Sequence, residues 1–574
     1  MRHFKPFGVA GLAITMSLFL VLVAIAASLS RSNIRVSTTD FFPADPYASV
    51  VGPPADVFQQ NEPHIVRHPT NANILAVGMN DVRTLSQSDD AWQGLAFSTN
   101  GGTKWSESLV PGWPGDPECP AISPVCGNAA GSDPVLGFDH DNHLYFSFIA
   151  FHRTPPGRPD FDPADANAIA VARYTVGGGN KLTYDFTAIV ERGTVGLGRQ
   201  EDKQWLAVDN TGSAFDGNVY TCWSRFSGSF DHLAFSRSTD GGVTWSKALI
   251  LDNGTAVQGC NLVVAPNQAG TAANEAGTVY LFYRKFRTSA FPTPTNRDAI
   301  FVLKSTDGGV SFGPPIHIAD FVDYRQISSR TPPVFRTFTI PGAAADENGV
   351  YVTWVTKNPG TGGDLKVAFS TNAGSTWTQL VNPPHQDSAP DLGHQLMPAM
   401  AAGGGKLSVV WYDSRSEPAF TANGPVTGSD NDAGPGCDGN PDPASPGNPE
   451  PDDGVPGCGM DVYYNQIPTA FLTAGQPWDA EVRLTAGSWN PNLWGSIKAI
   501  SPFIGDYIAL AADGTSAYAV WADNRDINAA VQRCDAGEDP AAGDCEDASV
   551  ATDPPTLINR RSRDSNIYFQ KVTK

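Results

Sequence analysis

The chain has 574 residues and a formal net charge of −21 at pH 7, although only 17% of its residues are charged. Such an acidic chain, with no basic stripe, repels phosphate backbones and anionic lipid, which excludes nucleic acid as the expected partner. Gly (57) and Pro (46) are plentiful, as is typical of many short strands joined by turns. We therefore expect one large all-β domain.

The N-terminus carries an export signal. Residues 1–5 read MRHFK, and an apolar run follows from about 7 to 29. Residues 24–26 and 26–28 offer small-x-small cleavage sites, but a run of this length can also stay in the membrane. Residues 1–30 are thus predicted to be a signal peptide or an N-terminal membrane anchor, and the remainder to be secreted or otherwise extracytoplasmic.

Eight cysteines in an exported chain are expected to form disulfides rather than to bind metal. Three pairs would each close one loop and the fourth would join adjacent repeats. The expected pairs are Cys119 with Cys126, Cys437 with Cys458, Cys534 with Cys545, and Cys222 with Cys260.

After an extended lead over residues 31–60, a short apolar strand recurs seven times. These strands are 74–77, 144–148, 219–223, 279–283, 350–354, 407–411 and 517–521. Most follow a Gly, Asn or Asp turn and another short strand, so each pair reads as a hairpin. Repeats that cannot bury their own faces must stack around a common core. Residues 61–574 are therefore predicted to form a seven-bladed β-propeller of four-stranded antiparallel blades, whose last blade takes its third strand from 566–572 and its fourth from the lead.

A second repeat is a turn motif with four copies. They are STNGGTKW from Ser98, STDGGVTW from Ser238, STDGGVSF from Ser305 and STNAGSTW from Ser370. The motif resembles the Asp-box, or BNR repeat, of sialidases and of other secreted β-propellers. That resemblance implies that the motif closes the outer hairpin of a blade, away from the catalytic face. Sialidases have six blades, which makes a six-bladed propeller the alternative.

Three long insertions, at 151–167, 417–459 and 526–564, fall between second and third strands. In the middle one, Asp430, Asp432 and Asp438 are candidate Ca²⁺ ligands. A solvated acidic loop is favoured, because the spacing matches no defined calcium motif. No cofactor is expected to be required, with Ca²⁺ as the one alternative. Likewise, the residues 139–142 fit a hairpin turn better than a calcium loop.

Charged side chains gather where the inner strands start and the second strands end, on one face of the predicted ring. The candidate catalytic residues are Glu62, Asp133, Asp202, Asp506 and Tyr507. The candidate substrate-binding residues are Arg83, Lys203, Arg225, Arg284, Arg336, Arg415 and Arg525. For the two W-x-D-x-R segments, at 411–415 and 521–525, we weigh an equal structural alternative in which Asp caps the loop and Arg pairs with a carboxylate of an adjacent blade.

Resemblance to sialidases implies a Tyr nucleophile, an Asp acid and base, and three arginines that hold the sugar carboxylate. Tyr507 and Arg83 match such positions, but Asn61 stands where the first arginine should be, which removes one charge-assisted clamp. The expected function is a glycoside hydrolase or lyase acting on a complex or acidic glycan or glycoconjugate. The alternative is a noncatalytic propeller that binds glycan or protein, with or without Ca²⁺. We expect a monomer.

Overall fold

The computed structural model describes residues 33–38, 60–84, 91–119, 121–152, 167–194, 198–228, 230–268, 275–287, 297–324, 336–337, 339–358, 362–385, 394–415, 460–487, 489, 503–527 and 563–573. Several predicted features lie outside these residues. They are the N-terminal signal or anchor, the candidate calcium ligands Asp430, Asp432 and Asp438, the pairs Cys437–Cys458 and Cys534–Cys545, and the side chain of Arg525.

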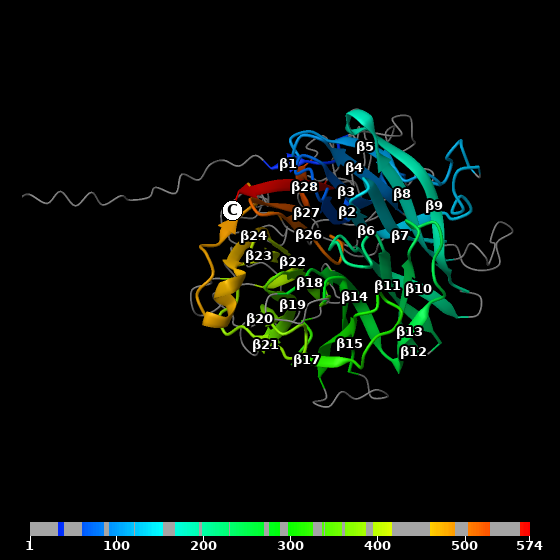
Figure 1. The fold of residues 1–574 in the computed structure, drawn as a ribbon. Coiled ribbons are helices and arrows are strands. Elements are labelled where there is room, and N and C mark those ends of the chain that lie inside the picture. Colours follow the sequence, from blue (N-terminus) through cyan, green and yellow to red (C-terminus); the bar gives the residue numbers. More distant parts are fainter. Residues whose placement is uncertain are drawn as a thin grey trace, which may run out of the picture.

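The described strands form seven four-stranded antiparallel sheets, the blades of a β-propeller (Figure 1). From inner to outer strand, blade 1 is β2 (Gln60–Arg67), β3 (Leu75–Asp81), β4 (Trp92–Ser98) and β5 (Ser106–Leu109); blade 2 is β6 (Ala130–Phe138), β7 (His143–Phe151), β8 (Asn167–Val176) and β9 (Leu182–Arg192); blade 3 is β10 (Arg199–Val208), β11 (Val219–Ser227), β12 (Phe230–Ser238) and β13 (Leu249–Thr255). Blade 4 is β14 (Val257–Ala265), β15 (Thr278–Lys285), β16 (Asp298–Ser305) and β17 (Ile316–Phe321); blade 5 is β18 (Gly342–Asp346), β19 (Gly349–Asn358), β20 (Gly362–Ser370) and β21 (Thr378–Gln379). Blade 6 is β22 (Gln395–Gly403), β23 (Lys406–Asp413), β24 (Asp461–Pro468) and β25 (Val482–Arg483); blade 7 is β26 (Ala509–Ala512), β27 (Ser516–Ile527), β28 (Arg563–Thr573) and β1 (Ile34–Arg35).

The predicted all-β, seven-bladed propeller is confirmed, and the six-bladed alternative is wrong. Three short 3-10 helices complete the described elements: Val82–Thr84, Gly178–Asn180 and Thr469–Ala474. Within the described residues, no helix has the length and apolar character needed to cross a bilayer.

The second strands are apolar on both faces because each blade packs between two others. All seven residues of β3 are buried, as are all seven of β4. At Gly78 in β3 a Cβ atom would lie 2.5 Å from Cδ1 of Leu136 in the next blade, so the two sheets meet without room for a larger residue. Near-continuous apolar strands are what burial on both faces requires.

The four repeated turns share one hydrogen-bond pattern and join the third and fourth strands of blades 1, 3, 4 and 5. The serine hydroxyl accepts the amide four residues later at 2.9–3.0 Å, from Gly102, Gly242, Gly309 and Gly374. The Asp or Asn side chain accepts the amide four residues after itself at 2.9–3.0 Å, in Asn100, Asp240, Asp307 and Asn372. These turns lie at the end of the propeller opposite the inner-strand starts.

The β6–β7 connection is a hairpin turn. Asp139 accepts the amides of Asp141 and His143 through Oδ1, at 2.9 and 2.8 Å, and the Tyr145 hydroxyl through Oδ2 at 2.8 Å. The carboxylate is therefore used by the turn itself, as an Asx turn uses it.

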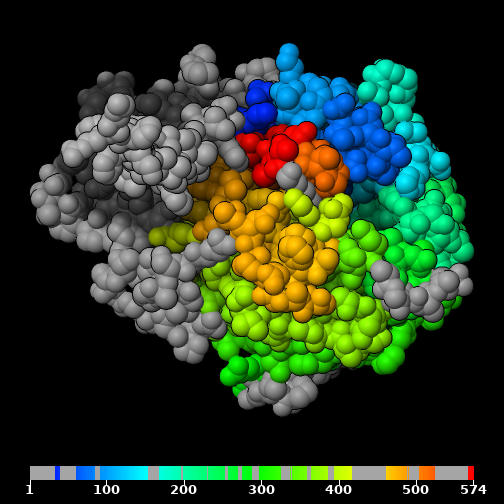
Figure 2. Space-filling model, turned by 60° about the vertical axis from the view of Figure 1, so that its left-hand side comes forward, coloured from blue at the N-terminus to red at the C-terminus, as the bar shows by residue number. Residues whose placement is uncertain are grey.

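The ring is closed by a short N-terminal segment, residues 33–38. In it, β1 pairs antiparallel with β28, so that the first and last described strands lie side by side (Figure 2). Asn33 reaches back to blade 6, where its Nδ2 donates to the Leu484 carbonyl at 2.9 Å. Ser37 donates forward to Gln60 of blade 1 at 2.6 Å. Six residues thus connect three blades.

Two of the four expected disulfides are present in the described residues. Cys119 pairs with Cys126 within one loop, and Cys222 of β11 pairs with Cys260 of β14 across blades 3 and 4. Disulfides persist in oxidising compartments, so both agree with an extracytoplasmic location.

Candidate functional site

Five inner strands carry a bulge at the same place, near the end of the propeller where they begin. Each has a residue with positive φ: Glu62 (51°), Asp133 (60°), Lys203 (48°), Gly259 (70°) and Met397 (48°). Positive φ is uncommon outside glycine and costs about 1–3 kcal/mol where it is strained. Three of these bulges, in consecutive blades, place a charged side chain at the mouth, by which we mean this end of the central channel.

Glu62 lies deepest. Its side chain is buried, with Oε2 accepting Nδ2 of Asn80 at 2.8 Å and Oε1 accepting the amide of Asp506 at 3.1 Å. Gly505 makes this approach possible, because a Cβ atom there would lie 2.8 Å from the Glu62 nitrogen. The sequence placed Glu62 and Asp506 at opposite ends of the chain, and ring closure brings them into contact.

Asp133 and Asp202 are partly exposed and border the opening. The Asp133 carboxyl shares a hydrogen bond with that of Glu62, and its amide donates to Oδ1 of Asn80 at 2.9 Å. The Gln204 side chain donates to the Asp133 carbonyl. Asp202 accepts the amide of Lys203 at 2.9 Å.

Asp506 is held by Arg336, the one predicted substrate-binding arginine that the structure shows well exposed. Nε and Nη2 of Arg336 donate to the two carboxylate oxygens at 3.1 and 2.5 Å. The Arg336 side chain is 46% exposed, whereas that of Asp506 is 9% exposed. A planar bidentate pair of this kind fixes both groups. We call Glu62, Asp133, Asp202 and Asp506 the carboxyl cluster.

Three members of the carboxyl cluster, Glu62, Asp202 and Asp506, hold protons more tightly than ordinary carboxylates do. Burial, with the nearby Asp133 charge, raises the pKa of Asp202 to about 7. Burial, with Asp133 and Asp506, raises the pKa of Glu62 well above its usual range. Burial also raises the pKa of Asp506, against the opposing effect of Arg336. Like charges in a desolvated site cannot all stay ionised, so the cluster is partly protonated near neutral pH.

Tyr507 is buried beneath the cluster. Its hydroxyl donates to the Pro134 carbonyl at 3.4 Å, and Nζ of Lys203 lies 3.6 Å from its ring centroid. Burial and the charges of Glu62, Asp133 and Asp506 raise its pKa well above the usual value.

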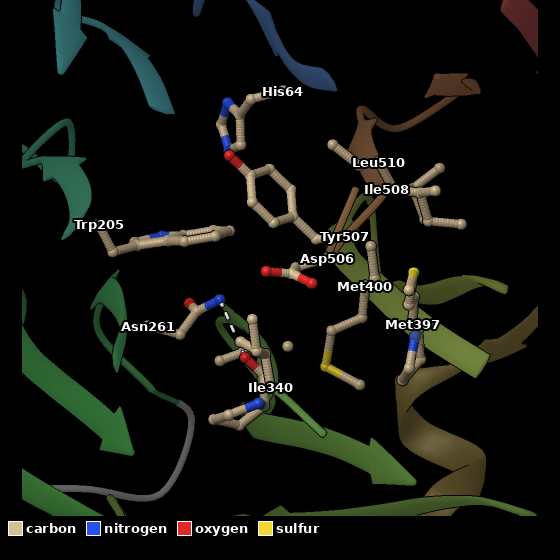
Figure 3. A pocket seen from close by; sticks show the side chains of 16 residues that line it. His64, Trp205, Asn261, Ile340, Met397, Met400, Asp506, Tyr507, Ile508 and Leu510 are labelled. Carbon is tan, nitrogen blue, oxygen red and sulfur yellow. Dashed lines mark hydrogen bonds between the residues drawn. The ribbon is translucent and has the colours of Figure 1, made fainter. Parts of the chain in front are cut away.

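Below the mouth lies a small cavity of about 50 Å³. Figure 3 shows His64, Trp205, Asn261, Met400 and Tyr507 around it, from five different blades. Burial and the Lys203 charge lower the pKa of His64 to about 3, so this imidazole is neutral and its Nδ1 accepts the Leu136 amide at 3.1 Å. The cavity has room for a few waters and not for a sugar ring.

The remaining described arginines of the predicted set are engaged in ion pairs away from the channel. Arg83 pairs with Asp81 and Glu107, Arg225 with Glu191 and Glu201, Arg284 with Asp298 and Asp323, and Arg415 with Asp413 and Glu481. For Arg83, Arg284 and Arg415, the partners come from the strands and loops of the same blade. Arg225 of blade 3 differs, because its partner Glu191 belongs to blade 2.

The W-x-D-x-R segments show the structural alternative in detail. Nε1 of Trp411 donates to Asp413 at 2.8 Å, and the Arg415 amide donates to the same carboxylate at 2.8 Å. Arg415 pairs with Glu481 of its own blade rather than of an adjacent one. In blade 7, Nε1 of Trp521 donates to Asp523 at 2.7 Å in the same way.

Several residues of the site were not singled out from the sequence. Asn80 is the most connected, since it binds Asn61, Glu62 and the Asp133 amide. Its signal was the polar pair Asn80 and Asp81 at the end of the otherwise apolar strand LAVGMND. His64, Trp205 and Asn261 each follow a bulge by two residues, at equivalent positions of three inner strands, and the sequence carries no signal for them because it does not reveal the bulges.

Among the described residues, no group of three or more His, Cys, Asp or Glu side chains has the geometry to hold a metal ion.

No family model and no curated protein matches this sequence. Among solved structures, the chain is similar to a Trypanosoma rangeli sialidase mutant displaying trans-sialidase activity (13% identity, 62% of this chain and 52% of that one, TM-score 0.36). It is also similar to the Hadza microbial sialidase Hz136 (12%, 78% and 73%, 0.37) and to a Penicillium chrysogenum alpha-L-arabinanase complexed with arabinobiose (14%, 66% and 94%, 0.39). The chain thus spans about half the length of the Trypanosoma protein. At these TM-scores the likeness carries no argument about activity.

Proposed function

We propose that this chain is a hydrolase acting on glycans, with its proton-transfer groups in the carboxyl cluster. The observation that supports this most is the meeting of four carboxyls from separate blades at one mouth, in unequal environments. Asp202 is partly exposed and has a pKa of about 7, so it can hold and release a proton near neutral pH. Hydrolysis of a glycosidic bond needs such an acid beside an ionised carboxylate.

The roles follow from exposure and hydrogen bonding. Asp202 donates its proton to the glycosidic oxygen as the bond from that oxygen to the anomeric carbon breaks. Water attacks the anomeric carbon, and Asp133 takes its proton. Glu62, which holds a proton because its pKa is raised, donates to Asp133 and keeps that carboxylate oriented. Arg336, which is paired with Asp506 and 46% exposed, fixes that carboxylate at the border of the mouth.

The second candidate is a noncatalytic propeller that binds glycan or protein at the same mouth. The ion pairs of Arg83, Arg225, Arg284 and Arg415 favour it, because arginines already paired with carboxylates are poorly placed to hold an acidic sugar. In this alternative the cluster recognises hydroxyl groups without turnover.

Hydrolysis assays on a panel of aryl glycosides of neutral, uronic and sialic sugars separate the two functions. For a hydrolase, Asp202→Asn and Asp133→Asn should each lower kcat about 10²–10⁴-fold, the range for a lost acid or base. The control is Asp216→Asn in the β10–β11 hairpin, at the opposite end of the propeller. This variant should leave kcat unchanged. Full activity of both mouth variants would overturn the proposed roles. Glycan binding without any turnover by the unmodified protein would establish the alternative.

A further inference from the structure

A buried ammonium group lies at the centre of the mouth. Lys203 is 3% exposed, and its Nζ donates no hydrogen bond to any residue that the structure describes. Its backbone has a φ of 48°, so the chain accepts strain in order to place this side chain. Taking an ammonium out of water without hydrogen bonds is costly unless opposite charges surround it.

Charged and titratable groups face Lys203 from every side. Strand β2 supplies Glu62 and His64, β6 supplies Asp133, β10 supplies Asp202, and the segment before β26 supplies Asp506 and Tyr507, with Arg336 beyond Asp506. The Lys203 charge lowers the pKa of each of Glu62, Asp202, Asp506 and His64 relative to what burial alone would give. Three carboxyls of the cluster thus share one buried cation.

The Tyr507 ring holds the ammonium in place. Nζ lies 3.6 Å from its centroid, and the Trp205 ring is the next aromatic neighbour at 5.6 Å. A desolvated cation on the face of an aromatic ring is attracted by the ring quadrupole. The ring is itself fixed, since the Tyr507 hydroxyl donates to the Pro134 carbonyl. Tyr507 therefore presents its ring, rather than its hydroxyl, to the charged groups.

We propose that Lys203 is a positioning residue: its ammonium, held against the Tyr507 ring, is the internal counter-ion that sets the pH range over which the carboxyl cluster works. The catalytic meaning of this role rests on the proposed hydrolase function. The counter-ion role does not, because it also determines how stability depends on pH.

Replacing the ammonium by a neutral side chain of similar length should make Glu62, Asp202 and Asp506 harder to ionise. An opposite charge at this range shifts a carboxyl pKa by about 1–3 units. Both limbs of the pH–rate profile should then move to higher pH. Stability should respond as well, because carboxyls with a raised folded pKa stabilise the fold only while they are protonated.

The test compares Lys203→Met with Lys304→Met. Lys304 is a matched control, since its Nζ also lies over a tyrosine ring, Tyr280 at 5.9 Å, but at the opposite end of the propeller. We expect Lys203→Met to move the pH–rate profile upward by at least about one unit. Its Tm, measured without substrate, should fall increasingly below that of the unmodified protein between pH 5 and pH 9. Lys304→Met should show neither change.

An unshifted profile, or a Tm deficit that is the same at every pH, would overturn the proposal. If the unmodified protein turns over no glycan, the hydrolase function fails, yet the Tm series still decides the counter-ion role. If Lys203→Met does not fold at pH 8, it should fold at pH 5, where the carboxyls are neutral, and failure at both values would count against the proposal.

Tyr507→Leu should reproduce the pH-dependent Tm deficit of Lys203→Met. Tyr507→Phe, which keeps the ring, should not; equal behaviour of the two Tyr507 variants would contradict the role of the ring.

Discussion

Asp202 makes the stability of this protein depend on pH in an unusual direction. An unfolded Asp has a pKa of about 3.9, and the folded value is about 7. The stabilisation from neutral Asp202 is therefore complete below about pH 4 and is lost as the pH rises through 7. Most carboxylates of a folded protein behave in the opposite way, because their folded pKa is lowered.

Replacing Asp202 by Asn should consequently stabilise the protein at alkaline pH. Asn keeps an acceptor for the Lys203 amide and cannot ionise. We expect equal Tm values at pH 4 and a Tm about 1–3 °C higher for the variant at pH 8, measured by thermal denaturation over that range. A higher Tm combined with lower activity would be the trade-off that a working site imposes. A Tm difference independent of pH would show that Asp202 ionises normally.

The sequence predicted the contacts of single side chains less well than it predicted the strands and turns. It placed Glu62, Asp133, Asp202 and Asp506 at inner-strand starts, and they do meet. It predicted that the arginines after the second strands lie on the same face, but it did not predict their ion-pair partners. Arg284 pairs with Asp298 and Asp323 because a neighbouring strand and a loop fold back beside it, which the sequence does not reveal. The bulges were also invisible, because no sequence rule marks Glu62 or Lys203 for positive φ.

At the scale of the element, the repeated turns offer a clear test of side-chain chemistry. Asp240 accepts the Thr244 amide at 2.9 Å and its hydroxyl at 2.6 Å, although the carboxylate is exposed. Asp240→Ala should lower the free energy of unfolding by about 1 kcal/mol, the usual net value of such hydrogen bonds, and should not alter the activity of the folded molecule. Chemical denaturation and the glycoside assay measure the two effects.

The chain contains its own control for this turn. In the fourth copy Asn372 accepts the Thr376 amide at 2.9 Å and donates to the Thr376 hydroxyl at 2.8 Å, so an amide can replace the carboxylate if the threonine hydroxyl reverses its role. Asp240→Asn should therefore cost less stability than Asp240→Ala. Equal losses would mean that the charge, rather than the acceptor, holds the turn.

Elements were predicted well because their signals are local. Apolar runs of four or five residues located the second strands, and the turn motif located four of the third-to-fourth connections. The predicted third strand at 566–572 lies within β28. Two inner strands begin later than predicted. Arg336 and Asp506 were expected to start their strands, but β18 begins at Gly342 and β26 at Ala509, so both charged residues lie just before the hydrogen-bonded part of the strand.

At the scale of the whole molecule, ring closure by residues 33–38 should determine stability. The segment buries Val36 and contributes hydrogen bonds to blades 6 and 1. One buried valine and a few hydrogen bonds are together worth about 4–6 kcal/mol. A chain beginning at residue 39 should melt about 3–6 °C below one that begins at residue 33, in calorimetry of the two purified forms. Equal Tm values would mean that the ring closes without this segment.

The pairing of β1 with β28 also orders events in time. The ribosome makes β1 before every other described strand and β28 after all of them, and a chain exported from its N-terminus arrives in the same order. Until β28 arrives, β1 has no partner and β27 has an unpaired edge, which is a template for wrong pairing with other chains. Closure of the ring through this pair can therefore occur only after β28 has been made and has reached the compartment in which β1 lies.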